Sequence, residues 1–282
     1  MDAVPALTRL GGIGSTADLL QLTTRKRLRR AVADRTIVHV SRGRYALPSA
    51  DLARSLAAEI DGHLRLLSAV AHWGWESKWP APYPQLGVTR KPDRPVEAEL
   101  FVVPRSDIDG WATSKVQTVL DCAAELPFDE ALAVADSALR HGAVTRDELE
   151  AAMPDDPRVH RVVAHATPLA ANPFESVLRA ILVEAGIGVV PQWATTIGRV
   201  TYHPDLAEPF AGLAIEANSW RHHAGKAEHD ADCRRYNALI VGGWTVLRFT
   251  WEQVMFCPWE VVAAVHGAMA LPCRGLGAIS MA

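Results

Sequence analysis

Two carboxylates in the last third of the chain have the spacing of a metal-binding pair. Asp205 lies at the end of one strand-like run, and Glu216 lies on the next, eleven residues later. A hairpin between these runs would bring both side chains to one edge of a sheet. Their hard oxygen ligands suit Mg²⁺ or Mn²⁺, and such an ion can activate water and offset charge on a scissile phosphate. The pair therefore predicts a site for metal-dependent phosphodiester hydrolysis.

Three nearby side chains could complete this chemistry. Glu175, on the helix that precedes the strands, can add a ligand or hold a metal-bound water. His222 and His223 follow Glu216 within a turn's reach, and either can shuttle a proton near neutral pH. We expect His223 to be the proton-transfer residue of the site.

Zinc is an alternative metal. His229 and Cys233 are four residues apart on one predicted helix face and could bind zinc together with His222 or His223, although the spacing matches no recognised zinc signature. The simpler interpretation is that Cys233 packs as a small apolar residue. The four cysteines form no close C-x-x-C pair, which argues against a disulfide framework.

Alternating helices and strands must position these side chains. Residues 172–188 (NPFESVLRAILVEAGIG) predict a helix that Gly186 and Gly188 end. Three strand-like runs, a helix, a buried strand and a terminal helix follow, at 189–195, 198–206, 210–218, 226–243, 244–250 and 259–271. This order predicts a mixed sheet flanked by helices.

Residues 172–265 resemble the very-short-patch-repair-like branch of the PD-(D/E)XK nuclease superfamily. The resemblance rests on ESVLRAILVEAG, Gln192, Asp205, IEANSWRHH, Asp232 with Arg234–Arg235, and the ending GGWTVLRFTWEQV. It implies a metal-dependent nuclease fold with Glu175, Asp205 and Glu216 as the metal-site acids, His223 in proton transfer, and Arg248 as a phosphate or structural contact.

One position departs from the superfamily pattern. The lysine that usually stands two residues after the second acid is replaced by Asn218. Asn can orient a water molecule but carries no charge to stabilise an attacking hydroxide. An active nuclease and a degenerate one, in which Asp205 and Glu216 only form hydrogen bonds, therefore both remain open.

The other end of the chain is basic. Residues 1–50 contain nine Lys and Arg against three Asp and Glu, a net charge of +6, whereas the remaining 232 residues have a net charge of −9. Ser15 or Thr16 can cap a first helix, and Thr23 or Thr24 a second helix with Leu28 and Val32 on its inward face. The sequence TIVHV-SRG-RYALP then predicts a hairpin.

This order of helix, basic helix and hairpin predicts a winged helix-turn-helix that binds double-stranded DNA. The second helix would enter the major groove, and the wing would meet phosphate or the minor groove. A solvated helix face is the alternative interpretation of the charge run. The residues predicted to contact DNA are Arg25, Lys26, Arg27, Arg29, Arg30, Arg42 and Arg44.

Residues 11–48 resemble the winged-helix head of AbiEi-type antitoxins, with Arg42-Gly43-Arg44-Tyr45 as the most specific part. The resemblance continues more loosely to about residue 150, through TSKVQTVLDCAAELPFDEALAVADSALRHGAVT. It implies sequence-specific DNA binding, often at the protein's own promoter, and in some members neutralisation of a partner toxin.

The middle of the chain carries no recognisable chemistry. It predicts helices, two short strands and a helix with a Thr145–Glu148 capping box. Trp73, Trp75 and Trp79 could stack on bases, but aromatic residues clustered at a helix end more often belong to a core. This region connects the two ends and could supply a homodimer or partner surface.

The whole chain is expected to be a cytoplasmic, multi-domain α/β protein of 282 residues without a membrane or targeting segment. The predicted domains are a winged helix at 1–50, an α/β connecting domain at 51–165 and a PD-(D/E)XK-like domain at 166–282. The favoured function is binding of double-stranded DNA, as a transcriptional regulator or antitoxin-like component of a toxin–antitoxin or defence locus. The alternatives are a Mg²⁺-dependent endonuclease and a scaffold that neutralises a toxin protein.

Overall fold

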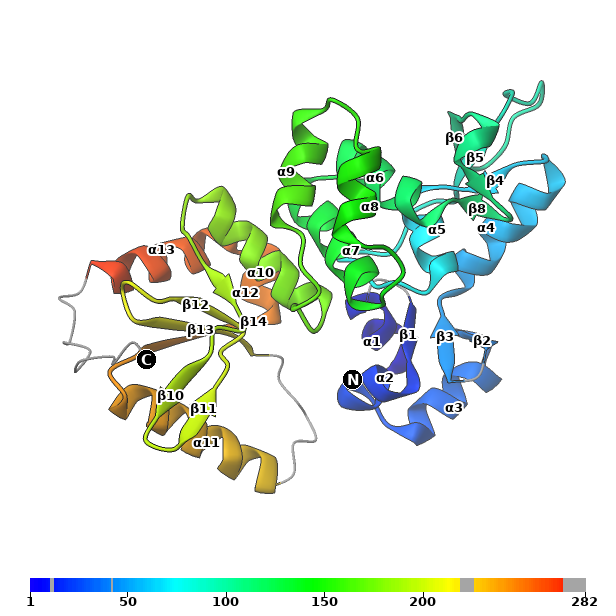
Figure 1. Ribbon diagram of the computed structural model, residues 1–282. Coiled ribbons are helices and arrows are strands. Elements are labelled where there is room, and N and C mark those ends of the chain that lie inside the picture. The colour runs from blue at the N-terminus through cyan, green and yellow to red at the C-terminus, as the bar shows by residue number, and fades with distance from the viewer. Residues whose placement is uncertain (11–12, 42, 219–225, 271–282) are drawn as a thin grey trace. The chain divides into compact units, whose positions relative to one another are not determined.

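The chain is a multi-domain α/β protein, as its sequence predicts, and it divides into two compact units, Met1–Pro173 and Phe174–Ala282. The computed structural model describes residues 1–10, 13–41, 43–218 and 226–270 (Figure 1). The division falls close to the start of α10 (Pro173–Glu184). The boundary at residues 50 and 51 lies inside the first unit and stays a prediction.

The first unit begins with three helices and a small antiparallel sheet, which we call the head. Its sheet has the order β1-β3-β2. The elements are α1 (Ala3–Arg9), β1 (Ile13–Ser15), α2 (Thr16–Leu22), α3 (Arg25–Ala33), β2 (Val38–Ser41) and β3 (Arg44–Ala46). The two predicted helices and the hairpin are confirmed. Sequence analysis did not identify α1 or β1.

Capping side chains fix where the head's helices begin. Ser15 and Asp18 form a capping box at α2, and the Thr24 hydroxyl accepts a hydrogen bond from the Arg27 backbone amide at 3.3 Å. The helices then bury Leu7, Leu19 and Leu28 against one another and against the strands. This apolar cluster positions α3 with one side inward.

A five-stranded mixed sheet follows the head. Its order is β6-β5-β4-β8-β7, and it packs with α4 (Pro48–Glu59) and α5 (Leu66–Trp73). The strands are β4 (His63–Leu64), β5 (Gln85–Val88), β6 (Glu99–Val102), β7 (Ile108–Asp109) and β8 (Ala112–Thr113). A short 3₁₀ turn, η1, spans Arg105–Asp107. The predicted α5, β5 and β6 are confirmed.

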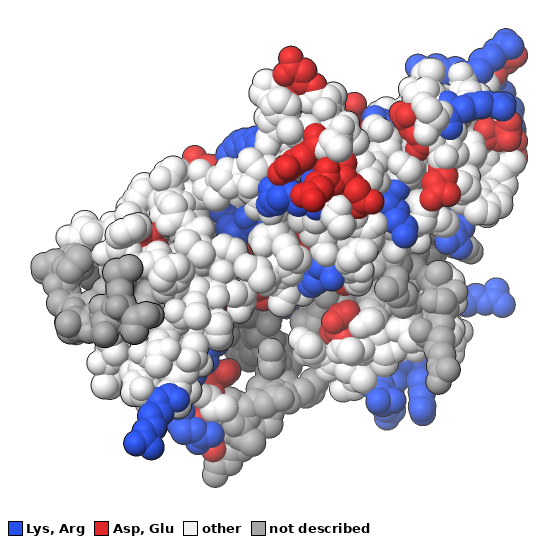
Figure 2. All heavy atoms as spheres, in the orientation of Figure 1, with Lys and Arg blue, Asp and Glu red and all other residues white. Residues whose placement is uncertain are grey.

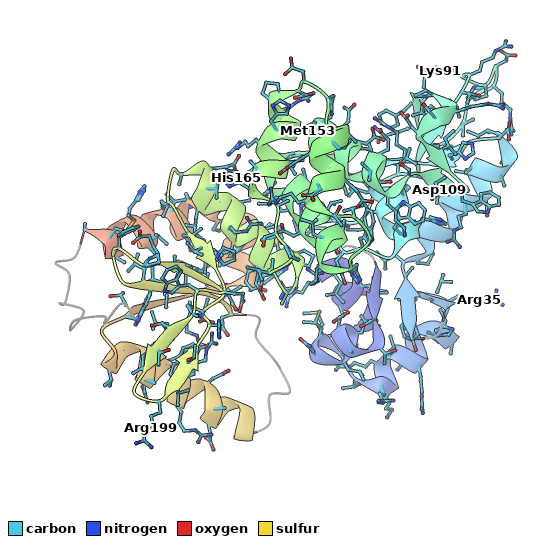
Figure 3. The ribbon with its side chains drawn as sticks, in the orientation of Figure 1. Arg35, Lys91, Asp109, Met153, His165 and Arg199 are labelled. Atoms are coloured by element: carbon cyan, nitrogen blue, oxygen red, sulfur yellow. The ribbon has the colours of Figure 1, made fainter. Side chains whose placement is uncertain are left out.

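Four helices complete the first unit. They are α6 (Lys115–Glu125), α7 (Phe128–Arg140), α8 (Arg146–Ala152) and α9 (Pro157–His165). The predicted capping box of Thr145 and Glu148 starts α8, and Met153 is its C-cap (Figure 3). Trp75 is buried, and Trp73 packs against the apolar cluster of the sheet, which supports the core interpretation of these aromatic residues.

The second unit contains a four-stranded sheet of order β14-β13-β12-β9. Only β13 and β14 run parallel. The strands are β9 (Val190–Pro191), β12 (Leu206–Glu208), β13 (Leu213–Asn218) and β14 (Thr245–Thr250), and a separate hairpin comprises β10 (Thr195–Ile197) and β11 (Val200–Tyr202). The helices are α10, α11 (Lys226–Val241), α12 (Trp251–Phe256) and α13 (Pro258–Met269).

Helices cover both faces of this sheet. Figure 1 shows α10, α12 and α13 on one side, and α11 with the β10–β11 hairpin on the other. On the α11 side, Leu239 packs with Ala214 and Trp244. Gly243, with φ +90°, follows the end of α11 and lets the chain turn into β14. The crossover through α11 therefore places one helix face directly over β13 and β14.

The described residues include no helix that is both long and apolar enough to cross a membrane.

Candidate functional site

The exposed face of α3 is the first candidate site. All five of its basic residues are exposed, whereas Leu28 is buried at 3% of its reference area. Figure 2 shows blue side chains projecting from the surface in the region of α3. The helix therefore packs through Leu28, Ala31 and Val32 and presents its cations to solvent. These cations are Arg25, Lys26, Arg27, Arg29 and Arg30.

Two of these cations already have acidic partners. Arg27 Nε lies 3.4 Å from Asp2, and Arg27 Nη1 also donates a hydrogen bond to the Met1 carbonyl. Arg30 Nε lies 3.4 Å from Asp34, four residues later on the helix. These two arginines line a groove of about 660 Å³ between α1 and α3.

The other three cations of α3 form no ion pair with any residue that the structure describes. Arg25 and Arg29 are four residues apart and so lie above one another on the helix, with Lys26 beside them. An anion that approaches this side has no internal acid to displace. Arg25, Lys26 and Arg29 are therefore the best placed of the predicted DNA contacts.

The wing arginines are less well defined. Arg42 lies outside the described residues. Arg44 is the first residue of β3, where it pairs with Ser15 and Ser41, but its side chain is outside the described part of the chain.

The second candidate site is the predicted carboxylate pair. Asp205 immediately precedes β12, rather than ending a strand as predicted, because the run 198–206 divides into β11 and β12. Asp205 Oδ2 accepts a hydrogen bond from the Ala217 amide at 2.9 Å. Ala217 follows Glu216 on β13, so the sheet brings the two acids together.

Arg235 of α11 forms a hydrogen bond with the Glu216 carboxyl group of this pair. Its Nη2 atom donates to Glu216 Oε1 at 2.7 Å and to the His203 carbonyl at 3.0 Å. The Glu216 side chain is only 4% exposed and the Arg235 side chain 27%. One guanidinium therefore connects the strand that carries Glu216 with the segment that leads into Asp205.

The charge of Asp205 affects the protonation of Glu216. Burial raises the pKa of Glu216, and the charge of the neighbouring Asp205 raises it further. Arg235 opposes this rise only in part, and the pKa of Glu216 is about 8. Burial, followed by the charge of Glu216, also raises the pKa of Tyr236. The pair is thus a place where negative charge is costly.

A second arginine lies on the neighbouring strand. Arg248 stands opposite Glu216 in the parallel β13–β14 register, and its guanidinium carbon lies 4.2 Å from the centre of the Tyr236 ring. This contact is a cation–π interaction with α11. Asn218, two residues after Glu216, ends β13 and is half-buried.

Glu175 is buried in the first turn of α10. The described residues contain no group of three or more His, Cys, Asp or Glu side chains arranged to hold a metal ion. Among the described residues, Glu175 therefore forms no three-ligand group with Asp205 and Glu216. Of the three acids that were predicted to lie together, only Asp205 and Glu216 are shown to do so.

The predicted histidines fall where the structure gives no description. His222 and His223 lie outside the described residues, as does the side chain of His229. The proton-transfer role of His223 and the zinc alternative therefore both stay hypotheses.

Arg235 was not predicted as a site residue, although its position in the sequence carries a signal. Arg235 stands four residues before Leu239, which is buried on the sheet side of α11. Residues four apart share a helix face, so the spacing alone directs Arg235 toward the sheet.

Comparison with known proteins identifies two relatives. The chain is 29% identical over 260 residues to "Uncharacterized protein MT2308" and, equally, to "Uncharacterized protein Rv2248", from two strains of Mycobacterium tuberculosis. The aligned region covers 86% of this chain and 96% of each relative. No protein-family model and no solved structure matches the chain.

Proposed function

We propose that the chain is a double-stranded DNA-binding protein whose head acts as a winged helix-turn-helix. The observation that carries this proposal is α3, where five exposed cations surround one buried leucine. The hairpin β2–β3, which follows directly, would be the wing. In modules of this order the second helix of the pair enters the major groove, which fits a helix as basic as α3.

The charge distribution supports an anionic partner. The net charge of +6 on residues 1–50 contrasts with −9 on the rest of the chain, and Figure 2 shows red side chains gathered over α8. DNA phosphates would be attracted to the head and repelled by acidic surfaces elsewhere. Binding would therefore be both steered to the head and strongly salt-dependent.

We propose a regulatory role for this binding, at a promoter of a toxin–antitoxin or defence locus in the cytoplasm. The AbiEi-like sequence of residues 11–48 supports this role. A homodimer could read two half-sites, and a cognate toxin protein would be the second partner. Residues 51–165 would supply the surface that binds the second copy of the chain or the toxin protein.

DNA binding is tested with Arg25→Ala/Arg29→Ala and a fluorescent duplex of mixed sequence. We expect weaker binding and a fall of about 1.8 in the magnitude of the slope of log K against log salt concentration, about 0.9 for each lost phosphate contact. Folding should not change, because both side chains are exposed.

The matched control is Lys91→Ala/Arg105→Ala, which removes two cations of the same unit that lie outside the head, are exposed and form no ion pair with any described residue. It should leave the slope unchanged. Equal losses in both double variants would show that only net charge matters, and would refute α3 as the interface. Arg27→Ala/Arg30→Ala should have a smaller effect, since both arginines already pair with acids.

The second candidate function is metal-dependent DNA cleavage by the second unit. The observation that favours it is the approach of Asp205 to Glu216, with Mg²⁺ or Mn²⁺ as the proposed cofactor. Asn218 and the Arg235 contact favour weak or absent cleavage. Plasmid nicking with each metal separates the two functions, because rapid nicking that Glu216→Ala abolishes would make the chain an endonuclease.

A further inference from the structure

Arg235 holds a position that determines how the carboxylate pair is neutralised. Its Nη2 atom bonds both to Glu216 Oε1 and to the backbone oxygen of His203, two residues before Asp205. Arginine is charged at all accessible pH values, and its planar donors suit carboxylate and carbonyl oxygens. The chain therefore supplies its own cation to the two segments that carry the acids.

One oxygen of each carboxylate already accepts a hydrogen bond from the protein. Glu216 Oε1 accepts from Arg235, and Asp205 Oδ2 accepts from the Ala217 amide. No third His, Cys, Asp or Glu joins them within the described residues. Mg²⁺ takes six oxygen ligands, several of them waters, and is commonly held by one or two carboxylates, so the guanidinium rather than the number of acids decides the fit. With Arg235 in place, this donor set does not fit a divalent cation.

The location of the ion pair adds to this conflict. Glu216 is almost fully buried and the Arg235 side chain is 27% exposed, so an incoming cation would meet the guanidinium charge in a partly desolvated site. The two would repel each other in a medium where charge interactions are stronger than in water. A divalent cation can reach the pair only by displacing the guanidinium.

We propose that Arg235 is a built-in counter-cation that replaces a divalent metal ion at the Asp205–Glu216 pair. The pair then acts as a structural site held by the hydrogen bond from Arg235 in the native chain and gains affinity for divalent cations only when the guanidinium is removed. This proposal is independent of DNA binding by the head, and it opposes the second candidate function, metal-dependent cleavage by the native chain.

The test is Mn²⁺ binding to the full chain, measured by electron paramagnetic resonance of free Mn²⁺ and by thermal denaturation. Arg235→Met removes the charge but keeps most of the aliphatic stem. We expect Mn²⁺ to bind this variant at least about tenfold more tightly than the wild type and to raise its Tm. The gain should disappear in Arg235→Met/Glu216→Gln.

Arg234→Met is the matched control, because Arg234 is the adjacent residue and is exposed. It should bind Mn²⁺ no better than the wild type. Arg235→Gln gives the same test if the methionine variant does not fold. Glu216-dependent Mn²⁺ binding by the wild type, or no gain in either Arg235 variant, would overturn the proposal.

Discussion

Each unit of the molecule contains a buried glutamate with a strongly shifted pKa, and the two shifts have opposite directions. In the first unit, Glu76 accepts hydrogen bonds from Ser137 and from Arg140 at 2.6 Å, and His141 Nε2 lies 3.0 Å away. Burial raises its pKa, but the hydrogen bond from His141, the charge of Arg140 and the Ser137 hydroxyl outweigh burial and hold it at about 2.

Glu216 in the second unit has a comparable degree of burial and a pKa of about 8. Arg235 donates to it, Arg248 lies on the neighbouring strand, and Asp205 is a second acid. Burial raises the pKa of both glutamates, so the difference comes from the donors around Glu76 and from the charge of Asp205 beside Glu216. Glu76 is a satisfied structural group, whereas Glu216 is held in an environment typical of functional sites.

The largest expected effect is that of Glu76→Gln. The amide cannot accept charge-assisted hydrogen bonds from Arg140 as a carboxylate does, so we expect a loss of about 3 kcal/mol in the free energy of unfolding at pH 7. Urea denaturation followed by tryptophan fluorescence measures it, and buried Trp75 is an adjacent reporter. A loss below about 1 kcal/mol would show that the donors contribute little.

The stabilisation by Glu76 should depend on pH. Its pKa is lower in the folded chain than its ordinary value of 4.5, so ionisation favours folding. The stability difference between wild type and Glu76→Gln should be full above about pH 5 and decline as the pH falls from 4.5 toward about 2. A difference that stays constant across this range would contradict the assignment to the Glu76 carboxylate.

Glu216→Gln should have a smaller effect of the opposite sign. The amide keeps an oxygen for Arg235 and is neutral at every pH, whereas Glu216, with its pKa of about 8 in the folded chain, must take up a proton on folding at pH 7, so we expect stabilisation of up to about 1 kcal/mol at pH 7. The same urea experiment compares it with Glu76→Gln. If both variants lose stability equally, the contrast between the two glutamates is wrong.

The smallest effect should come from an exposed pair. Asp34→Ala removes the partner of Arg30 on the surface of α3, where both side chains are more than half exposed. We expect no resolvable change in Tm, because water screens such pairs. DNA affinity should instead rise by about twofold, since Arg30 is released and an acid is lost. Weaker DNA binding by this variant would place the contact surface elsewhere.

Local sequence signals determined much of the secondary structure. The caps at Ser15, Thr24 and Thr145 were predictable because each bonds to a backbone amide three residues away. Strands β4, β7 and β8 were not identified, since two residues are too few to show an alternating pattern. Their pairing depends on partners distant in the sequence.

The sequence by itself determined which residues carry charge, and it placed Asp205 and Glu216 together because adjacent antiparallel strands connect them. Only the tertiary structure decided that Arg235 pairs with Glu216 and that Arg248 stands beside it. Both contacts depend on the crossover through α11 and the parallel pairing of β13 with β14. Such long-range packing determines the charge partners and the burial of each glutamate. It therefore decides whether the ionised carboxylate is stabilised, as in Glu76, or destabilised, as in Glu216.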